Sequence, residues 1–487
     1  MFDALRLCIA ARMTHFERAL DPALITPCLL PLTRRVENAV GELMLDIAPP
    51  TEVEKATMVD RMHLPIKLGG LGLVDHAVSA PLQRLMAVLK LTAAEEGTHN
   101  NPEDRVAAWM RHNGFNEALN RLKELANRDD DGNAGPNEDM EKWAQALAAG
   151  ELTHARAGAD LKDILEQRRF DQHLAKLSAP LKARAQSERA PGASTTFTLP
   201  QPTSRRRSKH QTLTWLGQMR MPDNDFRMSI TMRVLAPMIP SREDGMPLEC
   251  PHDACKGTVD RTGLHAECCP MFKAMRTKAH TKLQDSVEKF TRHHLGADVQ
   301  KGPEYDNVFG ASSELHLPRK QTTGTHKHAD LKISVDDRQP LTIDFCIAAV
   351  KPTNAASALT TPGALGKPLE DAKWADLNAL YKVQEKHKSA IFMCAWETTG
   401  GHTARTEDCI DHHLFLQRAA KLQNKHLAPN PSESQTSHLA AKFKANTARV
   451  VRSGACSMRR TYREKLLEKA GATNAASMQK LVRLSID

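Results

Sequence analysis

The chain has 487 residues, and its 67 Lys and Arg exceed its 58 Asp and Glu to give a formal net charge of +9. This length is too great for one ordinary domain, and the modest basic excess is compatible with nucleic acid without requiring it. Only 3 Tyr are present, which argues against a broad aromatic surface for base stacking, and no apolar run approaches the roughly 20 residues that span a bilayer.

The first part of the chain is expected to be mostly helical. Residues 1–48 look helical, with breaks at Pro22, Pro27 and Pro31. A glycine-rich segment at 64–73 predicts a tight turn, because its spacing is not that of a phosphate loop. Further helices are predicted at 104–127 and 139–178.

A break in this helical pattern covers 184–211, a stretch rich in Ser, Thr, Pro and Gln. We interpret it as a solvated linker. Its basic run, Arg205-Arg206-Arg207-Ser-Lys209, leaves open a nuclear-import signal or a patch that contacts phosphates.

Four residues with zinc-ligand chemistry follow, in the order Cys250-x4-Cys255-x9-His265-x3-Cys269. Zinc needs four N or S ligands, commonly supplied as two short pairs separated by a loop. The spacing therefore predicts a zinc knuckle. Cys268 is an alternative to Cys269, His252 is a spare ligand, and surface thiols without metal are the other interpretation.

The 10 cysteines do not form a disulfide pattern, because four cluster at 250–269 and the others are scattered. No signal peptide opens the sequence. We therefore expect a reducing intracellular compartment, nuclear or cytoplasmic.

An amphipathic helix is predicted at about 272–294, since apolar residues recur there at helical spacing. Strands follow this helix, and helical patterns return after them. Strands are predicted at 330–335, 341–349 and 389–396, and helices at 406–426 and beyond 437.

The first two of these strands predict a hairpin that pairs two aspartates. Asp330 lies seven residues before Asp337 in the polar turn, and Asp344 lies seven after it. Folding about that point brings Asp330 and Asp344 nearly opposite on one face. Two carboxylates this close repel unless a cation lies between them or one stays protonated, and Mg²⁺ is the usual cation. The alternative is a hairpin whose acids are solvated on its outer face.

Five short motifs, in order, resemble the tail of a non-LTR retrotransposon reverse transcriptase. In that family a zinc knuckle precedes a restriction-enzyme-like endonuclease of the PD-(D/E)xK class. The matching segments are Leu64-Pro65 with Gly69-Gly70-Leu71-Gly72-Leu73; Asp225-Phe226 with Arg233; Gly263-Leu264-His265-Ala266-Glu267-Cys268-Cys269-Pro270; Arg276-Thr-Lys-Ala-His280; and His328-Ala329-Asp330 with Asp344.

The resemblance implies a catalytic site. Asp330 and Asp344 would bind Mg²⁺ or Mn²⁺, and a lysine from a later helix would complete the site. Lys382 and Lys386 are the candidates, with Lys373 in reserve. The segment that contains Glu397 also resembles the family, and that glutamate is interpreted as structural.

Target DNA is the implied partner, with the element's RNA as a second candidate. No polymerase palm is present in this sequence, so we expect no reverse transcriptase activity from this chain alone. No membrane association is expected, and the sequence does not indicate an oligomeric state.

The predicted fold is mixed α/β: a mostly helical N-terminal half, a zinc knuckle, then a small restriction-endonuclease-like α/β domain with C-terminal helices. The expected division is 1–90, a thumb-like polymerase remnant; 91–183, a helical spacer; 184–211, a linker; 212–295, the knuckle and basic helix; 296–402, the endonuclease-like domain; and 403–487, a C-terminal helical region.

Two other functions remain open at this stage. One is a decayed or repurposed zinc-containing protein that binds nucleic acid without cutting it. The other is a helical interaction protein that binds no nucleic acid. Metal-dependent nicking and salt-dependent DNA binding distinguish these from the endonuclease.

Overall fold

The computed structural model describes residues 10–44, 47–92, 107, 109, 115–127, 138–149, 151–152, 154–197, 221–239, 248–252, 254–255, 257–305, 328–334, 340–351, 356, 359, 361–381, 390–416 and 433–469. The chain divides into two compact units. Unit 1 comprises residues 1–45, 50–178 and 233–235, and unit 2 comprises residues 46–49, 179–232 and 236–487. The finer six-part division of the sequence stays a prediction.

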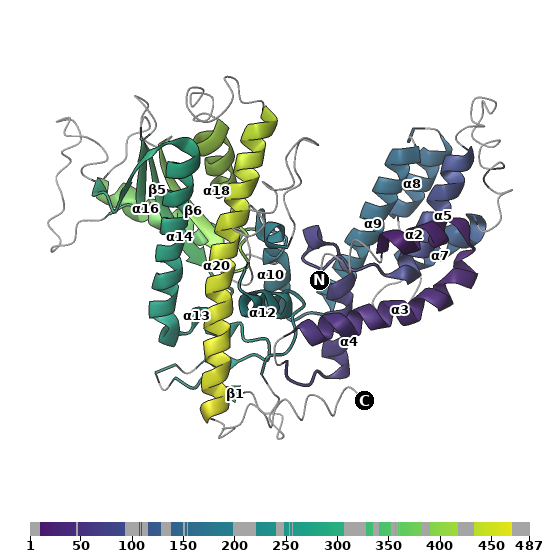
Figure 1. Cartoon of the computed structure of the whole chain (residues 1–487), viewed down its shortest axis with the longest axis horizontal. Coiled ribbons are helices and arrows are strands. Elements are labelled where there is room, and N and C mark those ends of the chain that lie inside the picture. The colour runs from purple at the N-terminus through teal and green to yellow at the C-terminus, as the bar shows by residue number, and fades with distance from the viewer. Residues whose placement is uncertain are drawn as a thin grey trace. The chain divides into compact units, whose positions relative to one another are not determined.

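The described elements of unit 1 are helical (Figure 1). Its core forms where Leu85 of α5, Leu122 of α7, Trp143 of α8 and Leu161 of α9 pack together. The elements are α2 (Ala10–Ala19), α3 (Pro22–Leu43), α4 (Glu52–His63), η2 (Ile66–Leu68), α5 (His76–Thr92), α7 (Phe115–Asn127), α8 (Glu138–Ala148) and α9 (His154–Ala175).

The predicted breaks at Pro27 and Pro31 are wrong, because α3 runs through both. Asp21 caps the helix by accepting a hydrogen bond from the Ala23 amide at 2.8 Å, and Pro22 occupies the first turn, where a missing N–H costs nothing. Pro27 and Pro31 are both exposed. Water can therefore satisfy the carbonyls that these two prolines leave without a helical donor.

The single helix predicted at 139–178 is also wrong, because α8 ends at Ala148 and α9 begins at His154. The Glu151 amide donates to the Ala146 carbonyl at 3.0 Å and closes the last turn of α8. At 64–73 the expected tight turn is confirmed: Gly69 and Gly72 have positive φ, at 82° and 69°.

Unit 2 combines helices with a small two-stranded sheet and a four-stranded mixed sheet (Figure 1). The predicted mixed α/β class, with helices dominant, is confirmed at this level. Its elements are α10 (Ala179–Ser187), η4 (Ala193–Thr196), α12 (Asp223–Arg233), β1 (Leu248–Glu249), β2 (Thr258–Val259), α13 (His265–Cys268), η5 (Pro270–Phe272), α14 (Lys273–Leu295), β3 (Asp298–Lys301), β4 (Leu331–Ser334), β5 (Leu341–Ala348), α16 (Lys367–Tyr381), β6 (Ile391–Glu397), α18 (Ala404–Asp408), η7 (Cys409–Leu416) and α20 (Glu433–Lys469).

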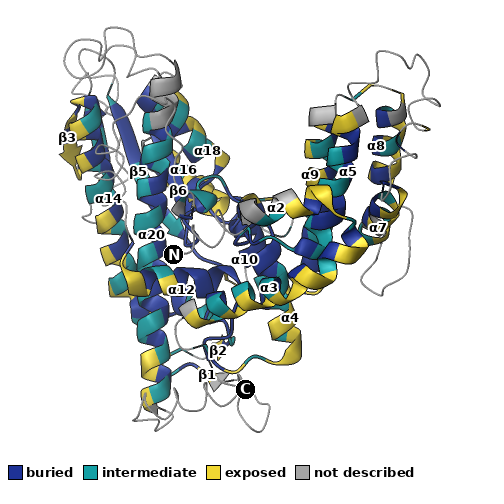
Figure 2. Ribbon diagram, turned by 45° about the vertical axis from the view of Figure 1, so that its right-hand side comes forward, coloured by how far each residue is buried: buried dark blue, intermediate teal, exposed yellow. Residues whose placement is uncertain are grey.

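The larger sheet has the order β3-β4-β5-β6, antiparallel except for the parallel pair β5 and β6. A parallel neighbour requires a crossover connection, which contains α16. On one face, Ile343 and Phe345 pack with α14, η7 and α20. On the other face, Met393 packs with Leu377 of α16. Figure 2 accordingly shows β5 in the dark blue of buried residues.

Helix α14 is predicted correctly, as is most of its buried face. Ala279, Leu283, Val287 and Phe290 are buried, and the last three belong to the sheet core. Helix α20 lies alongside α14 (Figure 1). It contributes Phe443 to the same core.

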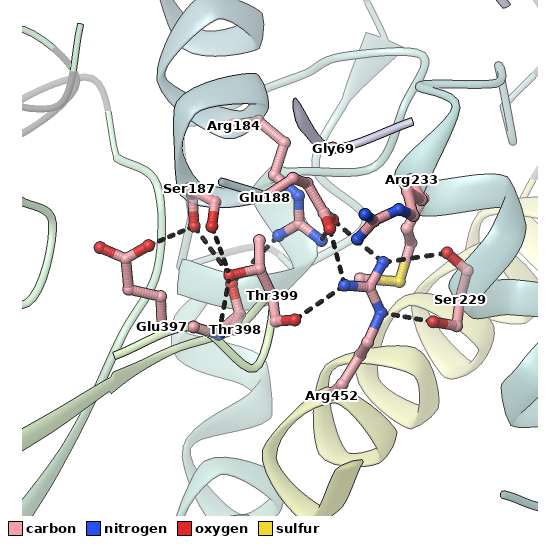
Figure 3. A network of polar contacts seen from close by, with 12 residues as sticks. Gly69, Arg184, Ser187, Glu188, Ser229, Arg233, Glu397, Thr398, Thr399 and Arg452 are labelled. Atoms are coloured by element: carbon pink, nitrogen blue, oxygen red, sulfur yellow. Dashed lines mark hydrogen bonds and ion pairs between the residues drawn. The ribbon is translucent and has the colours of Figure 1, made fainter. Parts of the chain in front are cut away.

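The expectation of a solvated linker is wrong for 184–197. Arg184, Ser187 and Glu188 are fully or almost fully buried there. Figure 3 shows the reason, which is a network of polar contacts around Arg184, Glu188 and Arg452. Arg452 of α20 pairs with Glu188 at 2.8 Å and donates to the Thr399 carbonyl at 2.7 Å. Partners that are distant in sequence thus satisfy the polar side chains of this segment. The basic run at 205–209 lies outside the described residues.

Glu397 is buried in this network and is structural, accepting hydrogen bonds from Ser187 at 2.5 Å and from the Leu365 amide at 3.0 Å. Burial raises its pKa from 4.5 to about 7, although Ser187 opposes the shift. Between these values the folded state holds more protons than the unfolded state, so stability falls as pH rises. A shift of this size corresponds to about 3 kcal/mol.

We predict that Glu397→Gln removes this contribution. The measurement is the free energy of unfolding by urea at pH 5 and at pH 8. The difference between the two should shrink by about 3 kcal/mol in the variant. Glu464→Gln, which changes an exposed glutamate of α20, should behave like the wild type. Equal pH dependence of Glu397→Gln and the wild type would contradict the assignment.

Candidate metal centres

The β1–β2 hairpin and α13 bring the four predicted zinc ligands together. Cys250 follows β1, and Cys255 lies in the hairpin loop. His265 begins α13 and Cys269 follows it. Asp260 fixes the start of α13, because its carboxylate accepts from the amides of Leu264 and His265, each at 3.1 Å. Two local turns thus set the positions of all four side chains.

The four ligand atoms lie within 4.8 Å of one another. Cys250 Sγ is 3.5 Å from Cys269 Sγ, and Cys255 Sγ is 3.4 Å from His265 Nε2. Tetrahedral zinc with bonds of about 2.3 Å to sulfur holds its ligands about 3.7 Å apart. The cluster could therefore bind a metal such as zinc, and the predicted convergence is confirmed.

The alternative ligand Cys268 lies outside the cluster. Its thiol donates to the His265 carbonyl at 3.4 Å. Burial raises the pKa of Cys269 to about 12 and lowers that of His265. Without metal, the side chains of Cys269 and His265 are thus held neutral. Metal binding requires the cysteine ligands as thiolates and releases their protons.

The predicted hairpin register is also confirmed. Leu331 pairs with Ile343 and Ile333 with Leu341. Asp330 and Asp344 occupy the next position along, and each carboxyl group influences the pKa of the other. The acids are not solvated, because their side chains are only 15% and 16% exposed. The structure therefore rules against a hairpin with its acids in water.

Several protein groups hold Asp330. Its Oδ1 accepts from Gln284 at 2.6 Å, and its Oδ2 accepts from the Phe345 amide at 2.5 Å. His280 Nε2 lies 3.1 Å from the same Oδ2. Burial alone would raise the pKa of Asp330, but the hydrogen bond from His280 and further partners lower it. Asp330 is thus held ionised.

Asp344 has a different environment. Burial raises its pKa to about 6, with a further rise from Asp330, while Lys373 opposes the shift. Lys373 Nζ lies 2.5 Å from Asp344 Oδ1 and 2.6 Å from the Phe345 carbonyl oxygen. Tyr305 donates to Asp344 Oδ2 at 3.4 Å. A cation therefore already lies beside two of the oxygens that a metal would use.

Among the described residues, Lys373, the reserve candidate, is the lysine that contacts Asp344. Lys382 and Lys386 lie outside the described residues. The contacts of His280, Gln284 and Tyr305 with the aspartates were not predicted. The four-residue spacing of His280 and Gln284 places both on one face of α14, beside its buried stripe. That spacing was the sequence signal from which a shared role of His280 and Gln284 could have been predicted.

Within the described part of the chain, none of the helices combines the length and apolar character needed to cross a bilayer. No protein-family model matches the chain. No curated protein matches it at a significant level.

Proposed function

We propose that unit 2 contains a metal-dependent DNA endonuclease of the non-LTR retrotransposon type. The observation that carries the proposal is the paired aspartates with a lysine. Asp344 Oδ1 and the Phe345 carbonyl oxygen both lie within 2.6 Å of Lys373 Nζ, and Asp330 adjoins them. Partly buried oxygens gathered around one positive charge form a set that Mg²⁺ or Mn²⁺ can use.

Asp330, Asp344 and the Phe345 carbonyl would hold the ion. Such an ion lowers the pKa of bound water and offsets the charge of a phosphodiester. Lys373 is the described residue that can place positive charge beside the developing charge on the phosphate. Gln284 and the Phe345 amide keep Asp330 oriented.

Free lysines on α14 support DNA as the substrate. Lys273, Lys278, Lys282 and Lys289 are exposed, and no ion pair to them occurs among the described residues. By contrast, Lys301 pairs with Asp285 at 2.6 Å and with Glu288 at 2.7 Å. Exposed lysines on the helix that also carries His280 and Gln284 are available to phosphates.

A second candidate is a zinc-containing module that binds nucleic acid without cutting it. The hydrogen bonds to both oxygens of Asp330 favour it. An aspartate whose two oxygens both accept hydrogen bonds from protein groups can have a purely structural role in the hairpin. A plasmid-nicking assay separates the two: the endonuclease converts supercoiled DNA to open circles with Mg²⁺ and stops with a chelator, whereas the binding module only retards the DNA.

We predict that Lys373→Gln lowers the nicking rate by about 10²- to 10³-fold, the usual cost of removing one charge-stabilising group. DNA affinity in a gel-shift assay should change little. Lys367→Gln is the control, because Lys367 is an exposed lysine on the same helix. If Lys373→Gln nicks as fast as the wild type, the catalytic lysine lies elsewhere, and Lys382 and Lys386 become the variants to test.

A further inference from the structure

Tyr462 lies against the cysteine cluster although it is far from it in sequence. The residue belongs to α20 and its side chain is fully buried. Its ring centroid is 5.7 Å from that of His265 and 5.8 Å from that of Phe272. Cys250 and Cys269 belong to the same apolar cluster. Helix α20 thus delivers one aromatic side chain to the back of the candidate zinc site.

The hydrogen bonding of the Tyr462 hydroxyl is unusual for a buried group. A buried tyrosine hydroxyl normally has a hydrogen-bond partner. The Tyr462 hydroxyl has none of normal geometry among the described residues. The donor is therefore buried in the cluster that contains the sulfurs of Cys250 and Cys269, which as neutral thiols are weak acceptors.

Metal binding would change that acceptor. Three thiolates and one imidazole around Zn²⁺ carry a net negative charge in a buried place. Hydrogen bonds from surrounding groups to the ligands commonly orient such a site and tune its affinity. The Tyr462 hydroxyl is a buried donor without a partner of normal geometry among the described residues, and its side chain packs in the same cluster as Cys250 and Cys269.

We propose that Tyr462 is a positioning residue that donates a hydrogen bond to the Cys250 thiolate when the cluster holds zinc. The inference rests on the zinc site within the proposed function and is independent of any nuclease activity. It makes α20 part of the metal site, because Cys456, Met458 and Leu466 of the same helix pack in that cluster. Zinc occupancy and the seating of this end of α20 would be coupled.

The test is Tyr462→Phe, which removes the O–H donor and keeps the ring. Zinc affinity is measured by competition with a chelating indicator, and we expect it to fall about 10- to 100-fold. In the cobalt(II)-substituted protein, the sulfur-to-metal charge-transfer band should move to longer wavelength, since an undonated thiolate is richer in electrons. Thr447→Val removes another buried hydroxyl of α20, one that donates to the Phe443 carbonyl at 3.0 Å. It should leave both readings unchanged.

A second measurement keeps the hydroxyl in place. Protein containing 3-fluorotyrosine has a more acidic, stronger donor, so the cobalt band should move to shorter wavelength. An unmoved band in both proteins overturns the proposal, even if Tyr462→Phe binds zinc more weakly. Absence of zinc from the wild type also overturns it, and shows that the metal site itself fails. Absence of nicking from a zinc-loaded wild type contradicts only the endonuclease.

Discussion

Replacing Asp344 by alanine should abolish nicking while DNA binding persists. Catalysis needs the metal that this carboxylate would hold, whereas affinity comes mostly from lysine contacts to phosphates. We expect the rate to fall by at least about 10³-fold. Affinity should be equal or slightly higher, because a buried negative charge that repels phosphate has been removed. Supercoiled plasmid with Mg²⁺, analysed on one gel for nicking and retardation, measures both quantities.

The matched control is Asp371→Ala. Asp371 is an exposed carboxylate on α16, the helix that carries Lys373. This variant should nick like the wild type. Binding without nicking in both the wild type and Asp344→Ala would support the binding module. Neither binding nor nicking would leave the helical interaction protein as the function to pursue. Affinity should also fall steeply with rising salt if phosphates are the main contact.

The second large effect is expected from loss of the zinc ligands. The double variant Cys255→Ser, His265→Ala removes one thiolate and the imidazole from a cluster whose ligand atoms lie within 4.8 Å. Zinc bound in this way contributes roughly 10 kcal/mol or more to local folding. We expect the protein to lose its single zinc. The segment around β1, β2 and α13 should become sensitive to protease.

Metal analysis of protein purified without added zinc provides the measurement. Cys268→Ser is the control, since the thiol of Cys268 donates to a backbone carbonyl and lies outside the cluster. That variant should retain one zinc per chain. A wild type without zinc, or a double variant with unchanged zinc, would refute the assignment of these ligands.

The parts of the site that were predicted correctly are local in sequence. The hairpin register follows from a polar turn and the alternation of apolar residues, which together place Leu331 opposite Ile343. The cysteine cluster follows from short ligand spacings. In both cases fewer than about 20 residues separate the partners, so one segment contains the whole signal.

The parts that were missed depend on distant segments. Tyr462 lies on α20 and packs beside the cysteine cluster. Lys373 lies on the crossover helix α16 and contacts Asp344. To predict which lysine of a helix contacts the aspartates, one must know how the helix is rotated about its axis relative to the sheet. The sequence does not give that rotation. Strand β3 was missed for another reason: its residues Asp298–Lys301 are polar, and only Val299 is buried. Arg184 was assigned to a linker from the polar composition of 184–211, and its partner Glu267, which comes 83 residues later, could not be identified from that segment.

Helix α20 has a consequence for the biogenesis of unit 2. Its Phe443 completes the core of the larger sheet, and its Tyr462 and Leu466 complete the core around the cysteines. This helix is translated after every other described element of the unit. Both hydrophobic cores therefore remain incomplete until the ribosome has synthesised α20. A nonsense codon before α20 would release a chain with two unfinished cores, which is a substrate for chaperones and proteases rather than a smaller working domain.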